Sequence, residues 1–316
     1  MPADPERKNP TVQETLSEGI RLLKAPCSEA YINTPELDAA LLLAETLHTG
    51  RTELIVRGKE QINESDRGKF FALLSRRRKG ECIAYILGHR EFRGLAFTVN
   101  SNVLVPRPDT EILVEAALEY IDQIAKEAQG KKLSVLDLCT GSGAIAIALK
   151  NERPLLELCA SDISGEALET AALNANRLLI NFTTNCEPSV RHELVPSVRT
   201  RTIHLTQSDL FENIRGKFDI IVSNPPYIPS GELSALAPEV RREPRLALDG
   251  GEDGLELIKK IISGAPDFLN PRGALLLEAG PEQMPLIRTL LESNHFGDIR
   301  IHRDLAGRER VISGRR

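Results

Sequence analysis

A short stretch in the second half of the chain most limits how it can fold. Phe218–Val222 is an apolar run interrupted only by Asp219, which predicts a strand buried on both faces. The strand must stop at Asn224, because Pro225 and Pro226 have no N–H to donate to a sheet ladder. Open parallel sheets bind ligands at the carboxyl ends of their central strands. We therefore expect an α/β protein with a site at this turn.

The turn Asn224-Pro225-Pro226-Tyr227 carries groups that suit a planar NH2 on an sp2 carbon. The Asn224 Oδ1 atom and the Pro225 carbonyl can each accept one N–H, which turns the nitrogen lone pair toward an electrophile. The Tyr227 ring can lie on a flat amide or base and favours positive charge above its face. The alternative is a proline-rich loop that only ends the strand. The complete run after a buried strand favours a site, and that site needs an electrophile.

A second strand offers a place for the electrophile. Ser134–Leu138 is an apolar run that leads into Cys139–Gly143, with the sequence Cys-Thr-Gly-Ser-Gly, and then into a predicted helix, Ala144–Lys150. Such a turn lets the backbone approach a ligand closely, and N–H groups at a helix start favour a carboxylate or phosphate. The third glycine of a dinucleotide fingerprint is absent, and no Gly-Lys-Ser/Thr follows, which excludes a P-loop.

The next two predicted strands also end in candidate ligand-binding residues. Asp162 follows the strand Leu155–Ala160 and can accept hydrogen bonds from both hydroxyls of a ribose. Asp209 follows the strand Thr202–Leu205 and could accept from an adenine amine, while Leu210 packs on the ring. Each acid alone is equally well explained as a helix cap or a surface residue. Together, on one edge of a sheet, they predict an adenosine-type cofactor.

Composition and charge exclude several classes of protein. The net charge of −5 over 316 residues offers no general attraction to nucleic acid, so we expect no direct DNA binding. No window approaches about 18 unbroken apolar residues and the first residues lack a signal-peptide core, so we expect a cytoplasmic protein without membrane contact. The five cysteines show no Cys-x-x-Cys spacing, which argues against a zinc site. We expect no metal, and a monomer.

Residues 1–90 are predicted to form a helical module without a catalytic constellation. Apolar residues repeat at helical spacing in Thr11–Lys24, a second helix is capped at Thr34, and Ser65–Lys79 forms a third. The basic run Arg76–Lys79 is either a solvated helix end or a contact with RNA or an RNA-bound partner. We interpret the module as a docking domain for a macromolecular substrate.

Residues 91–106 are predicted to be a β-hairpin linker. Leu95–Val99 and Val103–Val105 alternate with period two around a short polar turn. The domain at 107–316 then begins with a long helix capped by Asp109 or Thr110. Arg107 lies between two prolines just before it and is either structural or directed into the cleft.

Three later strands, Ala274–Glu278, Ile299–Ile301 and Val311–Ile312, complete a seven-stranded doubly wound sheet that is antiparallel at its final strand. Asn181–Arg201 is longer than a usual connection and is predicted to be a surface insertion at the edge opposite the cofactor. Ile228–Asp253 follows the catalytic strand on the ligand side and could form a substrate-facing lid. Its expected hinges are Gly250, Gly251 and Gly254, and its expected anchors are Arg241, Arg242 and Arg245.

These motifs resemble those of known methyltransferases. Asp137–Gly143 with Asp162 is similar to the S-adenosylmethionine site of the Rossmann-like class I S-adenosylmethionine-dependent methyltransferases. Asn-Pro-Pro-Tyr resembles the signature of members that methylate amide or exocyclic amino nitrogens. Residues 81–88, 105–111, 239–244 and 309–311 extend the similarity to nearly the whole chain, which resembles the HemK/PrmC family of glutamine N5-methyltransferases of class I peptide chain release factors.

The resemblance implies roles for particular residues. In that family the helical module grips the release factor, and the glutamine of its Gly-Gly-Gln loop enters the cleft. The candidate cofactor contacts are Asp137, Cys139, Thr140, Gly141, Ser142, Gly143, Asp162, Asp209, Leu210 and Asn224. The candidate catalytic and substrate-binding residues are Asn224, Pro225, Pro226 and Tyr227, with Arg107 as a further substrate contact. One departure is Cys139, where the family often has glycine.

Three other functions stay open on the sequence. Adenine N6 offers the same NH2 geometry, so a DNA or RNA amino-methyltransferase is one alternative. A ribosomal-protein glutamine is another possible acceptor. The third is a binding protein that uses the cofactor fold as a scaffold without turnover, although the intact Asn-Pro-Pro-Tyr run argues against it.

Overall fold

The computed structural model describes residues 9–26, 32–127, 132–183 and 202–316. The chain divides into two compact units. Met1–Gly88 and Leu236–Arg242 form the helical unit, and His89–Ala235 and Glu243–Arg316 form the sheet unit. The segment Leu236–Arg242 thus returns to the helical unit from the second half of the chain, which no sequence pattern predicted.

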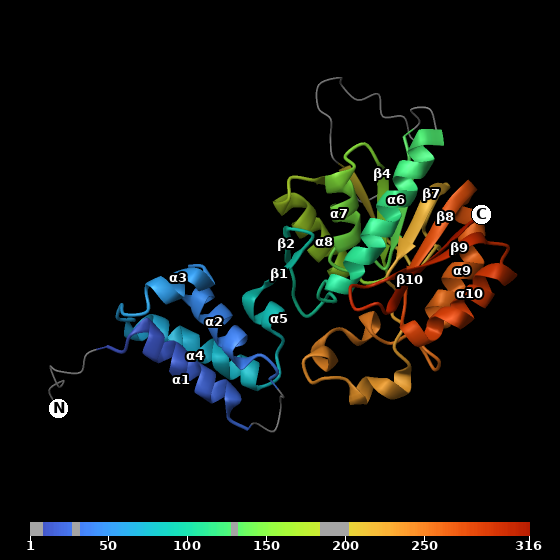
Figure 1. The fold of residues 1–316 in the computed structure, drawn as a ribbon. Coiled ribbons are helices and arrows are strands. Elements are labelled where there is room, and N and C mark those ends of the chain that lie inside the picture. The colour runs from blue at the N-terminus through green and yellow to red at the C-terminus, as the bar shows by residue number, and fades with distance from the viewer. Residues whose placement is uncertain (1–8, 27–31, 128–131, 184–201) are drawn as a thin grey trace, which may run out of the picture. The chain divides into compact units, whose positions relative to one another are not determined.

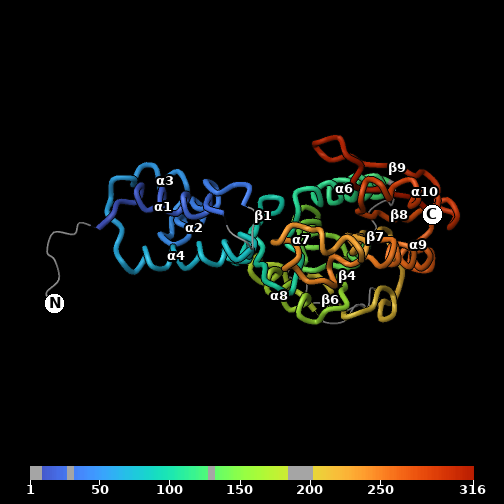
Figure 2. The backbone as a smooth tube through the Cα atoms, turned by 90° about the horizontal axis from the view of Figure 1, so that it is seen from below, coloured from blue at the N-terminus to red at the C-terminus, as the bar shows by residue number. Residues whose placement is uncertain are grey.

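The helices described in the helical unit are α1 (Val12–Lys24), α2 (Pro35–Thr46), α3 (Arg51–Val56), α4 (Glu64–Arg78) and α5 (Ile83–Leu87). Helix α1 starts with a capping box in which Thr11 Oγ1 accepts from the Glu14 N–H and the Glu14 carboxylate accepts from the Thr11 N–H. Figure 2 shows α1, α2 and α4 lying side by side. The core of this unit includes Leu42 and Phe70. The three predicted helices are confirmed, whereas α3 and α5 are too short to show a helical period.

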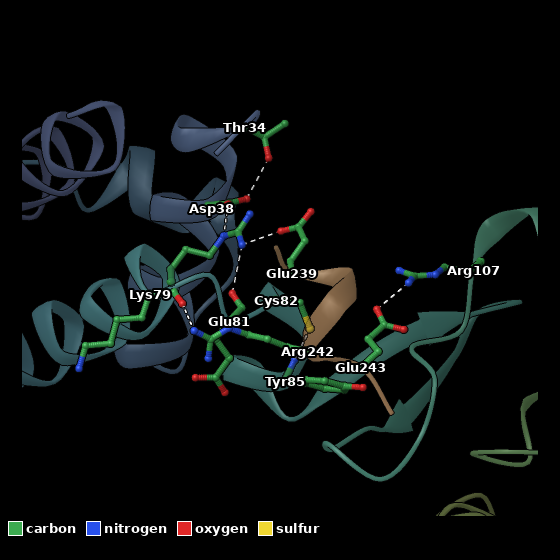
Figure 3. A network of polar contacts seen from close by, with 11 residues as sticks. Thr34, Asp38, Lys79, Glu81, Cys82, Tyr85, Arg107, Glu239, Arg242 and Glu243 are labelled. Atoms are coloured by element: carbon green, nitrogen blue, oxygen red, sulfur yellow. Dashed lines mark hydrogen bonds and ion pairs between the residues drawn. The ribbon is translucent and has the colours of Figure 1, made fainter. Parts of the chain in front are cut away.

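The basic run at the end of α4 takes part in the packing of the helical unit. Arg77 is 5% exposed, and its guanidinium forms ion pairs with Asp38 at 2.7 Å and with Glu239 at 2.6 Å; both carboxylates are labelled in Figure 3. Arg76 pairs with Glu81 at 2.5 Å. Burying a charge is costly unless it is paired and hydrogen-bonded, so two carboxylates around one guanidinium fit this site. The interpretation as a solvated helix end is therefore wrong for Arg77, which holds the returning segment.

A short hairpin opens the sheet unit and corrects the predicted one. Strand β1 (His89–Phe92) pairs antiparallel with β2 (Leu95–Thr98). The turn between them places Arg93 at φ +48° and Gly94 at φ +72°, the left-handed conformation that tight hairpin turns use. Val103–Val105 forms no strand. The prediction is wrong because the polar residues after Val99 carry the stronger local turn signal, whereas Arg93 and Gly94 form a turn only where β1 and β2 pair.

An eight-stranded, mostly parallel sheet forms the centre of the sheet unit in the described part of the chain. Its spatial order is β5 (Asn181–Thr183), β6 (Thr202–Gln207), β4 (Glu157–Asp162), β3 (Ser134–Leu138), β7 (Phe218–Ser223), β8 (Leu269–Glu278), β10 (Glu309–Arg315) and β9 (Gly297–Arg303). Strand β10 is antiparallel to both of its neighbours. The doubly wound sheet with an antiparallel final strand is thus confirmed, with one strand more than predicted.

The additional strand comes from the predicted insertion. Strand β5 takes the first three residues of Asn181–Arg201 and pairs in parallel with β6 at the sheet edge. Residues 184–201 of that predicted insertion lie outside the described residues. A strand of this length carries too few residues to show a hydrophobic period, and the sequence therefore could not reveal it.

Helices cover both faces of the sheet (Figure 1). They are α6 (Glu111–Glu127), α7 (Ala144–Glu152), α8 (Gly165–Arg177), α9 (Glu256–Phe268) and α10 (Met284–Ser293). Side chains alternate along a strand, so Val135 packs with α6, α7 and α8, and its neighbour Leu136 packs with α9 and α10. Among the helices described, none combines the length and the apolar character needed to cross a bilayer.

Strand register brings the predicted site residues to one edge. Leu138 at the end of β3 pairs with Ser161 of β4 on one side and with Ser223 of β7 on the other. The residues that follow, including Asp162 and Asn224, therefore leave the sheet at the same level. The sheet order also reverses here, since the connections run from β3 to β4 in one direction and from β6 to β7 in the other. Ligands bind at such a switch point.

Candidate active site

A cavity opens at the carboxyl edge of the sheet, at the ends of β3, β4, β6 and β7. The predicted site residues that line it are Arg107, Cys139, Thr140, Gly141, Ser142, Asp162, Asp209, Leu210, Asn224 and Pro226. Asp137, Gly143, Pro225 and Tyr227 are not part of its lining. In the described part of the chain, no cluster of His, Cys, Asp and Glu could hold a metal ion.

Asp137 stabilises the turn after β3 without lining the cavity. Its side chain is fully buried, and Oδ2 accepts from Thr140 Oγ1 at 2.6 Å and from the Ala146 N–H at 3.1 Å. Burial raises the pKa of this carboxyl group to about 7, against the lowering effect of the two hydrogen bonds. The carboxylate therefore fastens the turn to the start of α7 and lies outside the cavity wall.

Backbone conformation explains the residue types in this turn. Gly143 has φ +80°, and a Cβ there would lie 3.0 Å from Ile147 Cδ1 and 3.2 Å from Ala171 Cβ. Cys139 has φ +59°, a region that costs a residue with a Cβ roughly 1–2 kcal/mol. The glycine that the family often carries at the Cys139 position would avoid this cost.

Asp162 ties the turn after β3 to the helix after β4. One carboxylate oxygen accepts from the Gly141 N–H at 2.8 Å, and the other accepts from the Ser164 N–H at 3.0 Å. Burial raises the pKa of Asp162, whereas these backbone hydrogen bonds lower it. Each oxygen keeps a second lone pair, and the residue lines the cavity. Asp162 can therefore still accept hydrogen bonds from a diol.

The end of β6 contributes Asp209 and Leu210 to the cavity wall. Ser208 fixes this turn, since its N–H donates to the Asp162 carbonyl at 2.9 Å and its hydroxyl donates to the Leu210 carbonyl at 2.8 Å. Leu210 adopts φ +46°, which is unusual for a residue with a side chain. The turn places an apolar side chain beside a carboxylate, as the recognition of a flat base with an amine requires.

Asn224 ends β7 at the cavity wall. Its Nδ2 atom donates to Thr110 Oγ1 at 3.2 Å, across 114 positions of the sequence. The preceding residue, Ser223, donates from its hydroxyl to the Leu138 carbonyl at 2.8 Å, which fixes the strand end. Because the NH2 group of Asn224 donates to Thr110, the Oδ1 atom of Asn224 is the end of the side chain that can accept a hydrogen bond from a ligand.

The remaining residues of the Asn-Pro-Pro-Tyr turn are fixed by burial and by a hydrogen bond from Gln283. Pro225 and Pro226 are buried, and the Tyr227 carbonyl accepts from Gln283 Nε2 at 2.9 Å. Burial raises the pKa of the Tyr227 hydroxyl to about 12, with a further contribution from the charge of Glu278. Tyr227 therefore keeps its proton at neutral pH and does not act as a base.

Arg107 lines the cavity and is also structural, so the two interpretations of this residue combine. Its Nη2 atom lies 2.5 Å from Glu243 Oε1, and the Glu243 side chain is almost fully buried (Figure 3). The ion pair joins the residue before the 3-10 turn η1 (Pro108–Thr110) to the residue after η3 (Val240–Arg242).

The glycines predicted as hinges instead pack tightly beneath the active-site turn. Gly250 donates to the Ile228 carbonyl at 2.9 Å, and a Cβ at Gly250 would lie 2.8 Å from Tyr227 Cα. Gly254 has φ +72°, and a Cβ there would lie 2.4 Å from the Tyr227 carbonyl oxygen. These glycines allow two backbone segments to approach closely, and their role as hinges stays a prediction.

We expect Gly254→Ala to destabilise the protein, because the new Cβ must displace the Tyr227 backbone and the residue keeps a left-handed φ. The expected loss is about 1–3 kcal/mol of unfolding free energy. Chemical denaturation measures it, with Gly231→Ala as the control, since a Cβ at Gly231 meets nothing within 4 Å. Equal stability of the two variants would contradict the packing described here.

Glu278 is the last residue of β8 and is 2% exposed. Burial raises the pKa of its carboxyl group to about 7 from 4.5, although a hydrogen bond with Thr110 and the charge of Arg310 lower it. Because the folded-state pKa is the higher one, ionisation of Glu278 opposes folding. This cost is absent below about pH 4.5 and complete above about pH 7.

We therefore expect Glu278→Gln to gain stability relative to the wild type as the pH rises. At 1.36 kcal/mol for each pKa unit, the difference in unfolding free energy should move by about 3 kcal/mol in favour of the variant between pH 4.5 and 7. Urea denaturation of both proteins across this range tests the slope. A difference that does not change with pH would show that Glu278 is ionised without cost.

Several residues at the site were missed by sequence reasoning. Thr110 was predicted as a candidate helix cap, and Glu278 as the last residue of an apolar strand. The cavity is also lined by Leu246 and Ala247 of η4 (Arg245–Ala247). An ionisable residue at the end of a fully apolar run was a signal for Glu278, because an isolated buried charge is costly. No local pattern points to Leu246 or Ala247.

Comparisons with known proteins found two matching family models and similar proteins in several bacteria. Residues 15–88 match the PrmC N-terminal domain, and residues 115–239 match the methyltransferase small domain. The release factor glutamine methyltransferase of Burkholderia pseudomallei is 41% identical over 281 residues, which cover 88% of this chain and 91% of that protein. The chain belongs to the release factor glutamine methyltransferase family. The family member of Neisseria gonorrhoeae is 40% identical, covering 89% of this chain and 93% of that protein. The resemblance seen in the motifs is thus confirmed.

Solved structures support the fold. The catalytic domain of hMettl16, solved with a 3′UTR hairpin, superposes with a TM-score of 0.51 at 13% identity, covering 77% of this chain and 81% of that one. At this identity the likeness speaks for the fold alone. Together with family membership it confirms the Rossmann-like class I methyltransferase fold.

Proposed function

We propose that this chain transfers a methyl group from S-adenosylmethionine to the side-chain amide nitrogen, N5, of a glutamine. The proposed acceptor is the glutamine in the Gly-Gly-Gln motif of class I peptide chain release factors. The observation that carries the proposal is the state of Asn224, which lines the cavity and donates from its NH2 group to Thr110, so its amide oxygen is the end left to accept a hydrogen bond. That oxygen is the group that a substrate NH2 needs. The names of the family members support the choice of acceptor.

The residues around the cavity fit S-adenosylmethionine. Asp162 retains acceptor capacity for the ribose hydroxyls, Asp209 is available to an adenine amine, and Leu210 offers an apolar surface to the ring. The turn Cys139–Gly143 brings backbone close to the ligand and leads into the start of α7, which favours a carboxylate. When bound, the cofactor supplies a methyl group made electrophilic by the sulfonium.

The chain's own task is to position a poor nucleophile. The lone pair of an amide nitrogen is delocalised, so the nitrogen must be held at attack geometry while charge develops on it. Asn224 Oδ1 and the Pro225 carbonyl would each accept one of its hydrogens, and the ring of Tyr227 would stabilise the positive charge. A strong general base is not required, because an N-alkylated amide cation loses a proton readily.

The helical unit is proposed to dock the release factor, and Arg107 to contact the substrate at the cavity. We further propose that the protein acts as a monomer in the cytoplasm. The net charge of −5 supports a protein acceptor over DNA, because a nucleic-acid enzyme gains affinity from positive charge.

Methyl transfer from radiolabelled S-adenosylmethionine tests the function directly. Purified release factor, ribosomal proteins and DNA are offered in parallel, and the labelled product is mapped by peptide mass spectrometry. Label on the Gly-Gly-Gln glutamine is expected. Label on a ribosomal-protein glutamine would support the proposed chemistry with a different acceptor. Label on DNA alone would reject a protein substrate. Bound cofactor with no labelled acceptor would reject the proposal that the protein is an enzyme.

A further inference from the structure

We propose that Asn174, a fully buried residue of α8, is a positioning residue for the cofactor that holds the turn after β3 in its binding conformation. The geometry that carries this inference is a set of three hydrogen bonds from one side chain to two segments that are distant in the sequence. The inference rests on the proposed function only for the cofactor, S-adenosylmethionine. Asn174 itself does not line the cavity, so it acts through the residues that do.

Two segments of the cavity wall come from different parts of the chain. Residues 139–142 form the turn after β3, and residues 102–107 follow the hairpin strand β2. Neither segment lies in a strand or an α-helix, so neither has the regular backbone hydrogen bonds that fix such elements. Contacts with neighbouring elements therefore decide where these two segments lie.

One face of α8 supplies such contacts at the end of the hairpin. Thr170, Asn174 and Arg177 follow one another at the spacing of one helical turn, which puts them on the same face. Thr170 Oγ1 accepts from Asn100 Nδ2 at 3.2 Å, and Arg177 donates to the Thr98 hydroxyl at 2.5 Å. Asn174 Oδ1 accepts from the Thr98 N–H at 2.7 Å, and Asn174 Nδ2 donates to the Thr98 carbonyl at 3.0 Å. This face therefore holds the chain where it leaves β2.

Asn174 also reaches the turn after β3. Its Nδ2 atom donates a second hydrogen bond, to the Ser142 carbonyl at 2.9 Å. The helix and the turn approach closely here, since a Cβ at Gly143 would lie 3.2 Å from Ala171 Cβ. The polarity of the carboxamide is fixed by its partners, because its oxygen faces a backbone N–H and its NH2 faces two backbone carbonyls. One side chain thus fastens the turn to the hairpin.

Burial makes this connection important for the cofactor. Asn174 and Ser142 are both buried, so a Ser142 carbonyl without its partner has little access to water. An unpaired buried carbonyl is costly, and a turn that loses the partner gains free energy by shifting to another conformation. The cofactor must then restore the turn when it binds. The Kd rises as the fraction of free protein in the binding conformation falls.

The same argument separates cofactor binding from the catalytic step. In a protein that has bound its cofactor the turn has returned to its place, and the residues that hold the acceptor are unchanged. Loss of the Asn174 contacts should therefore weaken the binding of S-adenosylmethionine and leave kcat at saturating cofactor close to that of the wild type. A general loss of structure would lower both.

The test measures the Kd of S-adenosylmethionine by calorimetry in the wild type and in Asn174→Leu, which keeps the branched shape and removes all three hydrogen bonds. Loss of the hydrogen bond to the Ser142 carbonyl predicts a Kd roughly 2- to 13-fold higher. Asn174→Ala is the second variant, since its smaller side chain leaves room for a water molecule beside the freed carbonyls. Its Kd should change in the same direction, with kcat close to that of the wild type.

Thr170→Val is the matched control. Thr170 is buried on the same face of α8, and its hydroxyl accepts from Asn100 and donates to the Glu166 carbonyl within the helix. Thr170→Val should lower stability and leave the Kd unchanged. A wild-type Kd in both Asn174 variants would overturn the proposal. An equal rise of the Kd in Thr170→Val would overturn it as well, because the effect would then come from the hairpin end and not from the turn.

A measurement on the wild type decides the case in which neither Asn174 variant folds. The backbone N–H of Thr98 should exchange slowly with solvent in the cofactor-free protein, as followed by NMR, because Asn174 Oδ1 accepts it. Fast exchange would mean that the contact is absent before the cofactor binds, which would overturn the proposal. A wild type that binds the cofactor and methylates no acceptor would refute the proposed function alone, since the Kd values do not depend on methyl transfer.

Discussion

Replacing Asn224 by alanine should slow methyl transfer roughly 5- to 150-fold, the cost of about 1–3 kcal/mol for one buried, oriented hydrogen bond. The substrate nitrogen would lose the acceptor that fixes its lone pair, while the turn keeps its two prolines and its contact with Gln283. Single-turnover rates with saturating cofactor and release factor measure the effect. The melting temperature should stay close to that of the wild type.

Asn270→Ala is the matched control for that experiment. Its Nδ2 atom donates to Asp219 Oδ1 at 2.8 Å at the start of β8, so this asparagine is also half-buried and also engaged through its NH2. Its loss should lower stability and leave the methyl-transfer rate unchanged. Unchanged turnover in Asn224→Ala would refute the role given to that residue, and slowed turnover in both variants would point to a general loss of structure.

Asp162→Asn should weaken the binding of S-adenosylmethionine roughly 100-fold, even though the two side chains have the same shape. Both carboxylate oxygens already accept backbone N–H groups, from Gly141 and Ser164. A carboxamide must turn its NH2 toward one of these donors, which leaves that N–H unpaired and removes an acceptor for the ribose. The unpaired backbone N–H is the same in the free and the bound protein, so the change in affinity comes from the lost ribose hydrogen bond to a charged group. At about 1.5–3 kcal/mol, that loss corresponds to a weakening of roughly 10- to 150-fold.

Calorimetric titration with S-adenosylmethionine measures this affinity, and Asp219→Asn is its control. The Asp219 carboxylate also accepts from two N–H donors, the Ser134 backbone at 2.9 Å and Asn270 Nδ2 at 2.8 Å, but it lies at the opposite end of the strands. Asp219→Asn should lower stability and leave the affinity unchanged. A wild-type affinity in Asp162→Asn would remove Asp162 from the cofactor site.

Some features of the site were readable because their signals are local. The buried strand Phe218–Ser223 is recognisable in the sequence as an apolar run, and the prolines that follow define where it stops. The acid at the end of β4, Asp162, is likewise recognised from its position a few residues after an apolar run. For such features, composition and spacing carry the whole physical argument.

Other features failed to appear in the sequence because nothing local encodes them. Strand β5 is three residues long, and α3 is shorter than two helical turns, so neither can display a period. The hairpin was misplaced because Arg93 and Gly94 form a turn only when the flanking strands pair. The pairing of Arg77 with Glu239 needs the segment Leu236–Arg242 to return to the helical unit.

The sequence by itself determined the class of fold, the edge of the sheet at which the candidate site lies and the residues proposed to face a planar NH2, since strand periods, prolines and glycines act on their immediate neighbours. Only the tertiary structure decided how those residues are presented. It brought Thr110 to the NH2 group of Asn224, left Asp137 out of the cavity lining that it was expected to join, and packed Gly254 against the Tyr227 backbone. The reason is physical: hydrogen-bond polarity and close packing depend on neighbours that folding brings together from distant parts of the chain.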